Sequence, residues 1–293
     1  MEALKKSECE IKDNFDLTAY SSAKLPMYAR YVAYPDNEEK LVNLLSLLCE
    51  IQIPYKLMGG MTNLLVKNGM YDGVVIKTDK LQRKRLAENR ITLFCGVRMA
   101  SVIRSMARLG LGGMDGLAGI PGSVGGMVRQ NAGAYGYEIS DRFVSADCYL
   151  TKDKKVVTLS KDCMQFEYRN SVLTDNSTVL VSATFELIPS SPQLLLERIS
   201  DFGKKRRASQ PIEYPSLGST FKRYNGQSAG FYIDRAGLKG ARVGAAEVSE
   251  KHAGFIINKG GATADDFLKL IDIVKGRVYS YFGIELEEEI EII

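Results

Sequence analysis

Apolar positions recur along the chain at two spacings, and the pattern predicts a fold of the α+β class. Helical spacing, with apolar residues three or four apart, covers residues 41–49, 100–109, 194–207 and 265–282. Short apolar or alternating runs that predict strands cover residues 53–57, 64–67, 73–77, 90–95, 144–150, 155–159 and 179–188. The early helix and strands together form a first α+β unit.

Several residues indicate where these helices begin and end. The first predicted helix starts beside Glu38 and Glu39, and Gly110 follows the second helix as a C-terminal stop. Asp265 and Asp266 open the last helix, where negative charge complements the helix dipole. Its apolar stripe consists of Leu268, Ile271, Val274 and Val278.

The strongest linker signal is the Pro-Ser-Ser-Pro sequence at residues 189–192. Two prolines resist helix and strand, and the serines contribute little packing. A chain of 293 residues favours two or three domains. We therefore expect a domain boundary near residue 190.

Composition and charge exclude some classes of function. Hydrophobic residues make up 45% of the chain, and 39 Lys and Arg against 35 Asp and Glu leave a net charge of +4. The longest basic cluster, residues 204–207, has only four members and is equally compatible with a solvated helix face. No dense basic stretch is interleaved with aromatic residues, so we expect no nucleic-acid partner.

Cysteine, histidine and the N-terminal segment point to a reducing compartment. The five cysteines form no C-x-x-C pair and His252 is the only histidine, so we expect no metal site. Residues 1–16 are charged and lack the apolar core of a signal peptide, and no apolar run reaches about 18 residues. We expect a cytoplasmic protein without membrane insertion.

Two glycine-rich segments, residues 59–63 and 118–126, offer backbone without side-chain bulk. Successive exposed N–H groups in such segments can bind phosphate oxygens. Neither segment has the G-x-G-x-x-G or the P-loop pattern. One such loop alone is as compatible with tight turns, but two loops flanked by strands favour a large phosphate-bearing cofactor.

Six ordered motifs make the sequence resemble a known family. LAGIPGSVGG at 117–126, followed by NAGAYG at 131–136, resembles the flavin-binding segment of the UDP-N-acetylenolpyruvoylglucosamine reductase (MurB) family. Residues 59–66 resemble its first flavin loop. EYRNS at 167–171, GSTFK at 218–222 and LEEEI at 286–290 resemble three further motifs. The resemblance runs from about residue 53 to residue 293, and the spacing resembles the family's smaller type, which lacks an extra substrate-capping loop.

Three positions depart from the family pattern. Residues 22–27 lack the glycines of the family's N-terminal motif, and Met61 replaces the third glycine of the first flavin loop. Arg223 and Tyr224 replace a common Asn-Pro, although the arginine occurs in the smaller type. The first two departures bear on flavin contacts in the first domain.

The resemblance implies a two-part FAD-binding region of the PCMH-like flavin-oxidoreductase type followed by a C-terminal α+β substrate domain. It places FAD-binding subdomains at 1–79 and 80–190 and the substrate-binding domain at 191–293. FAD is expected to be bound non-covalently. The implied flavin-binding residues are Gly59, Gly60, Met61, Thr62, Asn63, Leu64, Gly119, Ile120, Pro121, Gly122, Ser123, Gly125, Gly126, Asn131, Gly133 and Ala134.

The resemblance also implies a reaction, in which NADPH reduces FAD and UDP-N-acetylglucosamine enolpyruvate is then reduced to UDP-N-acetylmuramate, a peptidoglycan precursor. Ser219 corresponds to the proton donor, Arg169 to the residue that binds the enolpyruvyl carboxylate, and Glu289 to the acidic catalytic residue. Read alone, these could be a turn serine, a surface ion-pair residue and part of a solvated glutamate run. The implied substrate-binding residues are Tyr168, Arg207, Lys222 and Arg223.

Two other functions are compatible with parts of this pattern. Another FAD oxidoreductase of the same fold, such as an alcohol oxidase, often tethers its flavin to histidine or cysteine, but His252 lies outside the glycine-rich loops. A non-catalytic flavin- or nucleotide-sugar-binding relative would not need Arg169, Ser219 and Glu289 together. We therefore expect a monomeric enzyme, with a structural role for His252.

Overall fold

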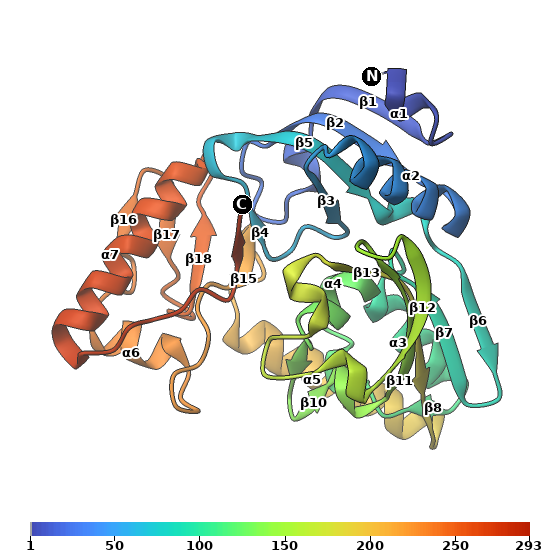
Figure 1. Cartoon of the computed structure of the whole chain (residues 1–293). Helices are drawn as coiled ribbons and strands as arrows, with labels where there is room; N and C mark the ends of the chain where they lie inside the picture. Colours follow the sequence, from blue (N-terminus) through green and yellow to red (C-terminus); the bar gives the residue numbers. More distant parts are fainter. Residues whose placement is uncertain (1) are drawn as a thin grey trace. The chain divides into compact units, whose positions relative to one another are not determined.

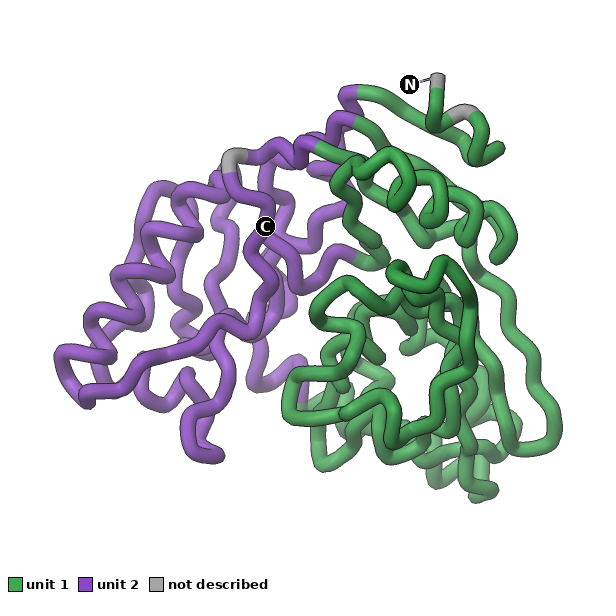
Figure 2. Tube along the Cα trace, in the orientation of Figure 1, with its two compact units in different colours: residues 1–13, 31–60, 73–205 green, residues 14–30, 61–72, 206–293 purple. Residues whose placement is uncertain are grey.

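The computed structural model describes residues 2–293, which fall into two compact units (Figure 2). Unit 1 consists of Met1–Asp13, Tyr31–Gly60 and Gly73–Lys205, and unit 2 of Asn14–Arg30, Met61–Asp72 and Arg206–Ile293. Met1, at which the predicted first subdomain begins, lies outside the described residues. The functional division at residues 79 and 190 stays a prediction, because compactness alone assigns no ligand to a segment.

The largest sheet belongs to unit 1 and has five antiparallel strands in the order β12-β11-β13-β7-β6 (Figure 1). These strands are β6 (Lys84–Ala87), β7 (Arg90–Phe94), β11 (Phe143–Leu150), β12 (Lys155–Ser160) and β13 (Thr178–Glu186). The sequence predicts four of the five within about two residues. It misses β6, because every residue of this edge strand is exposed and no apolar alternation marks it.

A second sheet has the strand order β1-β2-β5-β3. Its strands are β1 (Glu10–Asp16), β2 (Tyr28–Tyr34), β3 (Tyr55–Met58) and β5 (Met70–Lys77). Between β2 and β3 the chain forms α2 (Glu38–Ile51), which buries four leucines. The Asn37 side chain caps α2 by accepting a hydrogen bond from the Lys40 N–H, and Glu38 and Glu39 lie in its first turn as predicted.

Four further helices of the chain are α1 (Glu2–Lys5), α3 (Met99–Arg108), α4 (Val124–Arg129) and α5 (Pro192–Ser209). The apolar face of α3 is buried, and Gly110 follows the helix with a φ of +74°. Helix α4 begins inside the second glycine-rich segment and extends three residues past its end, where the sequence predicts no helix. Its glycines hide the apolar periodicity, and the Ser123 side chain caps it.

The predicted linker at 189–192 is wrong in part, because both of its prolines belong to regular elements. Pro189 ends β14 (Ile188–Pro189), which pairs with β8 (Leu111–Gly112). Pro192 is the first residue of α5, a position where a missing backbone N–H costs little. Unit 1 accordingly continues through this segment to Lys205.

Unit 2 is built around a four-stranded antiparallel sheet in the order β15-β18-β17-β16. The strands are β15 (Ser216–Ser219), β16 (Arg242–Val243), β17 (Ala246–Val248) and β18 (Phe255–Asn258), and the helices are α6 (Ala229–Arg235) and α7 (Ala264–Phe282). Helix α7 runs beside this sheet (Figure 1). Phe267, Leu270, Ile271, Val274 and Val278 of α7 are buried.

Two short strands join distant parts of the chain in unit 2. The parallel pair β4 (Leu64–Leu65) and β19 (Glu291–Ile292) aligns Leu64 with Glu291. The glutamates that precede β19 are not in a strand, although the apolar–acidic pattern is compatible with one. Only an isolated bridge, between Phe221 and Glu288, occurs there. None of the described helices is both long and apolar enough to span a bilayer.

Candidate functional site

Gly59, which follows β3 in unit 1, is a point of close backbone approach. A Cβ atom at this position would lie 2.1 Å from Ser123 Oγ, so a side chain there would displace that hydroxyl. The Lys77 side chain, 1% exposed at the end of β5, holds the same residue. Its Nζ donates to the Gly59 carbonyl at 2.8 Å and pairs with Asp79 at 2.9 Å. Burial lowers the pKa of Lys77.

The second glycine-rich segment is fixed to the chain after β7. The N–H groups of Val124 and Gly125 donate to the carbonyls of Val97 and Cys95, both at 2.8 Å. A Cβ atom on Gly96 would lie 1.8 Å from the Thr78 carbonyl oxygen, so this glycine permits a third close approach. Within unit 1, Gly59 at the start of the first glycine-rich segment and residues 123–125 of the second are therefore packed around residues 77–79 and 95–97.

These residues fit a phosphate-bearing cofactor such as FAD. The buried Thr78 Oγ1 has no hydrogen-bond partner among the described residues, and it lies 3.4 Å from the position of a Cβ on Gly59. A buried hydroxyl without a partner is costly in a folded protein unless a ligand satisfies it. Bare glycine backbone supplies N–H donors of the kind that bind a diphosphate, and Lys77, paired with Asp79, holds this backbone in place at Gly59.

Sequence reasoning missed Lys77 and Thr78 as candidates. The available signal was a lysine at the end of the otherwise apolar run at 73–77, because a charged residue there must be paired or serve a ligand when the strand is buried. Asp79 is the paired residue in the structure.

Four predicted site residues of unit 1 lie together. The buried Asn131 side chain donates to Glu138 Oε2 at 3.0 Å and to the Glu167 carbonyl at 3.2 Å. The Arg169 Nη2 donates to the Gly133 carbonyl at 3.1 Å. The Arg169 guanidinium also lies over the Tyr168 ring, 4.9 Å from its centroid. Asn131 thus organises the loop that holds Arg169.

Arg129 organises the next segment and was also missed. Its guanidinium donates to the carbonyls of Leu173 and Thr174, the latter at 2.9 Å. The Ser171 hydroxyl donates back to the Arg129 carbonyl at 2.8 Å. The chain that leaves the Tyr-Arg motif is therefore fastened to α4.

Ser219 and Glu289, which are 70 residues apart in the sequence, are brought together in unit 2. Ser219 ends β15, and the Glu289 N–H donates to the carbonyl of the adjacent Thr220 at 2.8 Å. Asn63, a predicted flavin contact, donates through Nδ2 to the Glu289 carbonyl at 2.9 Å, and its own carbonyl accepts from the Glu291 N–H. The Asn63 side chain and the backbone of Thr220, next to Ser219, thus both hold the backbone of Glu289.

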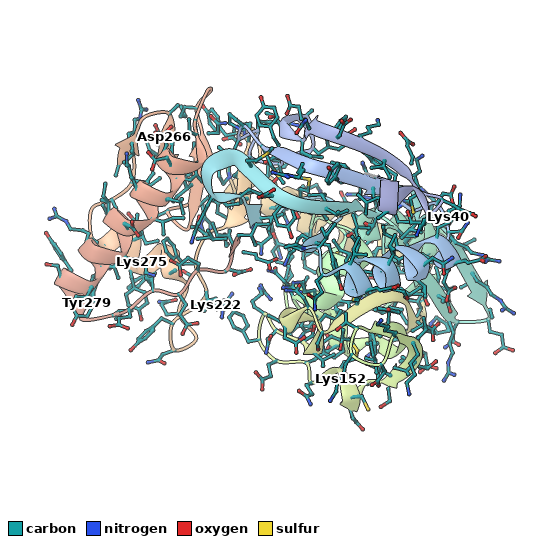
Figure 3. The ribbon with its side chains drawn as sticks, turned by 45° about the horizontal axis from the view of Figure 1, so that its top comes forward. Lys40, Lys152, Lys222, Asp266, Lys275 and Tyr279 are labelled. Atoms are coloured by element: carbon teal, nitrogen blue, oxygen red, sulfur yellow. The ribbon has the colours of Figure 1, made fainter. Side chains whose placement is uncertain are left out.

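Neighbouring glutamates of the run at 287–289 form ion pairs with different lysines. Glu287 pairs with Lys222 at 3.2 Å and Glu288 pairs with Lys275 of α7 at 2.8 Å. Figure 3 labels both lysines. Lys222, a predicted substrate residue, therefore already neutralises one acid of the run.

Met61 occupies the position of the family's third glycine and lies in unit 2. Its φ is +48°, in the left-handed region that glycine adopts at low cost. The Met61 side chain is buried, and its carbonyl accepts from the Ser22 N–H at 3.2 Å. Met61 thus adopts the left-handed backbone conformation that glycine adopts easily, and its side chain is packed in the interior.

The remaining predicted residues stay predictions. Arg207, near the end of α5, and Arg223 are both exposed. The flavin contacts that likewise stay predictions are Gly60, Thr62, Leu64, Gly119, Ile120, Pro121, Gly122, Gly126 and Ala134.

Within the described residues, no cluster of three or more His, Cys, Asp or Glu side chains could hold a metal ion.

Comparison with known proteins matches both parts of the chain. An FAD binding domain matches residues 29–160, and the C-terminal domain of UDP-N-acetylenolpyruvoylglucosamine reductase matches residues 210–293. The reductase of Lactobacillus helveticus is 39% identical over 290 residues, which are 99% of this chain and 97% of the relative. That of Caldicellulosiruptor saccharolyticus is 40% identical over 99% of this chain and 94% of the relative.

Solved structures agree with the predicted fold. The crystal structure of UDP-N-acetylenolpyruvylglucosamine reductase (MurB) from Thermus caldophilus superimposes with a TM-score of 0.82 at 30% identity, covering 97% of this chain and 98% of that one. The 6-hydroxy-D-nicotine oxidase of Arthrobacter nicotinovorans matches with a TM-score of 0.50 at 17% identity, over 62% of this chain and 42% of that chain. The second match shows only the shared fold, and together they confirm the predicted fold class.

Proposed function

Because this chain belongs to the UDP-N-acetylenolpyruvoylglucosamine reductase family and is an FAD-binding oxidoreductase, we propose that it reduces UDP-N-acetylglucosamine enolpyruvate to UDP-N-acetylmuramate with NADPH. The observation that supports the proposed catalysis best is the backbone connection between Ser219 and Glu289 through Thr220. It brings a hydroxyl-bearing residue and a carboxylate-bearing residue to one place in unit 2.

FAD, held by the glycine-rich segments, would supply the hydride chemistry by which NADPH reduces the enolpyruvyl methylene carbon. The protein must then deliver one proton to the neighbouring carbon. We assign that proton to the Ser219 hydroxyl, which is a weak acid and acts only at short range on a carbanion-like centre. The balance is one NADPH and one proton consumed for each double bond saturated.

Arg169 binds the substrate carboxylate in this proposal. Its guanidinium stays charged at all physiological pH values and can form two parallel hydrogen bonds with a carboxylate. The bond to the Gly133 carbonyl and the contact with Tyr168 restrict the arginine before substrate arrives. Less conformational entropy is then lost on binding.

The nucleotide-sugar part of the substrate requires cationic and aromatic groups. We assign this role to Tyr168, Arg207, Lys222 and Arg223. Glu289 acts as the acidic partner at the substrate carboxylate, whose oxygens take up the enolate-like charge once hydride reaches the methylene carbon. We further propose that residues 1–79 and 80–190 bind FAD and that residues 191–293 bind substrate.

A turnover assay with three substrates tests this function. NADPH oxidation should depend on UDP-N-acetylglucosamine enolpyruvate and should yield a product two mass units heavier, one added hydrogen coming from solvent. UDP-N-acetylglucosamine, which lacks the double bond, should give no turnover. Turnover with simple alcohols and oxygen instead would assign the chain to the alcohol-oxidase alternative, and FAD binding without any turnover would assign it to a non-catalytic relative.

A further inference from the structure

The turn at residues 249–255 supports the segment that carries Ser219. The Thr220 N–H donates to the Gly254 carbonyl at 2.8 Å, and the Thr220 carbonyl accepts from Glu289. The Thr220 side chain is buried, and its Oγ1 accepts from the Ile256 N–H at 3.3 Å. The position of the Ser219–Thr220 peptide therefore depends on where the Gly254 peptide lies.

His252 holds Gly254 through its N–H, one peptide group before the carbonyl that Thr220 contacts. The Gly254 N–H donates to His252 Nδ1 at 3.1 Å, so this nitrogen must be unprotonated. The imidazole packs edge-on against Phe255, with centroids 4.9 Å apart. A Cβ atom on Gly230 of α6 would lie 3.3 Å from His252 Cε1. The ring is therefore wedged between α6 and β18.

We propose that His252 is a positioning residue for Ser219, acting through the bond from Gly254 to its Nδ1 and the bond from Thr220 to Gly254. This inference rests on the proposed role of Ser219 as proton donor. His252 touches neither substrate nor cofactor in this account. A proton on Nδ1 would replace the acceptor with a donor and break the first bond of the series.

The surroundings of the ring favour the neutral imidazole. Burial lowers the pKa of His252 from its usual value, a backbone hydrogen bond opposes this in part, and the Lys239 ammonium lowers the pKa further. Lys239 pairs with Asp234 of α6 at 2.8 Å, and the adjacent Lys251 pairs with Glu213 at 3.4 Å. Glu250, which belongs to the same turn as His252, lies against Gly240. The neutral form thus prevails at neutral pH and is lost as pH falls through the lowered pKa.

Two substitutions of His252 distinguish its hydrogen bond to Gly254, which positions Ser219, from the packing of its ring. In His252→Asn, the amide oxygen can take the place of Nδ1 as an acceptor and does not titrate, whereas His252→Leu keeps apolar bulk and removes the acceptor. At pH 7.5 we expect His252→Leu to slow reoxidation of the reduced protein by the enolpyruvyl substrate about three- to tenfold, the usual effect of one lost hydrogen bond. Reduction by NADPH should be unchanged. His252→Asn should stay within about twofold of wild type.

The pH profile and NMR supply independent readouts. Because His252 is the only histidine, its imidazole carbon–proton signal gives its pKa without assignment. The acid limb of wild-type reoxidation should coincide with that pKa and be absent in His252→Asn. An acid limb that persists in His252→Asn, or two half-reactions slowed equally, would overturn the inference, and so would an unaffected His252→Leu.

Ser219→Ala in the same assay distinguishes a failure of the positioning role of His252 from a failure of the proton-donor role of Ser219. If Ser219→Ala slows reoxidation and the His252 variants do not, only the positioning role fails. If Ser219→Ala itself reoxidises normally, the proposed proton donor fails. Should His252→Leu not fold, His252→Asn and the NMR titration still decide the matter.

Discussion

Lys77 is a buried charged residue that holds the start of the first glycine-rich segment at Gly59. Its ammonium is buried, yet it has both an acid partner and the Gly59 carbonyl as acceptor. Burying a charged group costs much free energy unless the group is paired and hydrogen-bonded, as Lys77 is here. We infer that Lys77 sets the backbone conformation of the first glycine-rich segment at Gly59.

Lys77→Met should therefore weaken FAD binding while leaving the fold intact. Methionine retains the aliphatic volume, but the Gly59 carbonyl loses a charge-assisted donor worth about 1.5–3 kcal/mol. We expect the dissociation constant for FAD, measured by titrating apoprotein, to rise about tenfold or more. Lys80→Met is the matched control, because Lys80 is exposed and its ammonium pairs with Glu10 and lies over the Tyr34 ring, away from Gly59. Equal FAD affinity in a folded Lys77→Met protein would contradict this interpretation.

At the residue scale, the motifs predicted Ser219 and Glu289 but not what holds them. Only the tertiary structure shows that Glu289 is bonded to Thr220, 69 positions away, and to Asn63, 226 positions away. Lys77 lay in an apolar run, and a strand pattern alone does not tell whether a terminal lysine is buried. These features depend on packing, which periodicity does not encode.

At the scale of elements, α7 shows which helix ends are encoded locally. Thr263 and Asp266 form a reciprocal capping box at its start, and Gly283 ends it with a φ of +65°. Gly276 lies in the middle of the helix, with no atom within 4 Å of where a Cβ would be. Two glycines of one helix thus differ chiefly in backbone conformation.

That difference predicts opposite effects of the same substitution. Gly276→Ala should raise the free energy of unfolding by about 0.5–1 kcal/mol, because alanine has the higher helix propensity. Gly283→Ala should lower it by about 1 kcal/mol, because alanine is strained at positive φ. Urea unfolding of both variants measures the difference. If the two changes had the same sign, the conformations assigned to these glycines would be wrong.

Long periodic elements were predictable and short ones were not. The predicted helix at 265–282 differs from α7 by one residue, because its stripe and cap lie in one continuous segment. Helices α4 and α6 have only six and seven residues, too few to establish a period. Pairs such as β4 with β19 form only when distant segments meet.

At the scale of the whole molecule, the available nucleophiles argue for non-covalent flavin. Burial raises the pKa of Cys95 and Cys148 to about 12, so neither forms a thiolate readily. The His252 imidazole is engaged with Gly254. We expect acid precipitation to release all flavin into the supernatant, in wild type and equally in Cys163→Ser, whose thiol is exposed. Yellow colour that remained with the precipitate would contradict this expectation.

The central claim is that one chain carries two half-reactions and that Ser219 serves only the second. Stopped-flow absorbance of the flavin measures both on the same sample. In Ser219→Ala, reduction by NADPH should proceed at the wild-type rate, because that step needs no proton at the substrate carbon. Reoxidation by UDP-N-acetylglucosamine enolpyruvate should slow by about 10²–10⁴-fold, the usual contribution of general acid catalysis.

Two further variants make that measurement decisive. Ser219→Cys should recover part of the rate, because a thiol also donates a proton, and Ser216→Ala on the same strand should leave both rates near wild type. If Ser219 is the proton donor, Ser219→Ala shows slow reoxidation and normal reduction. Normal reoxidation, or equal slowing of both half-reactions in the folded variant, would contradict it.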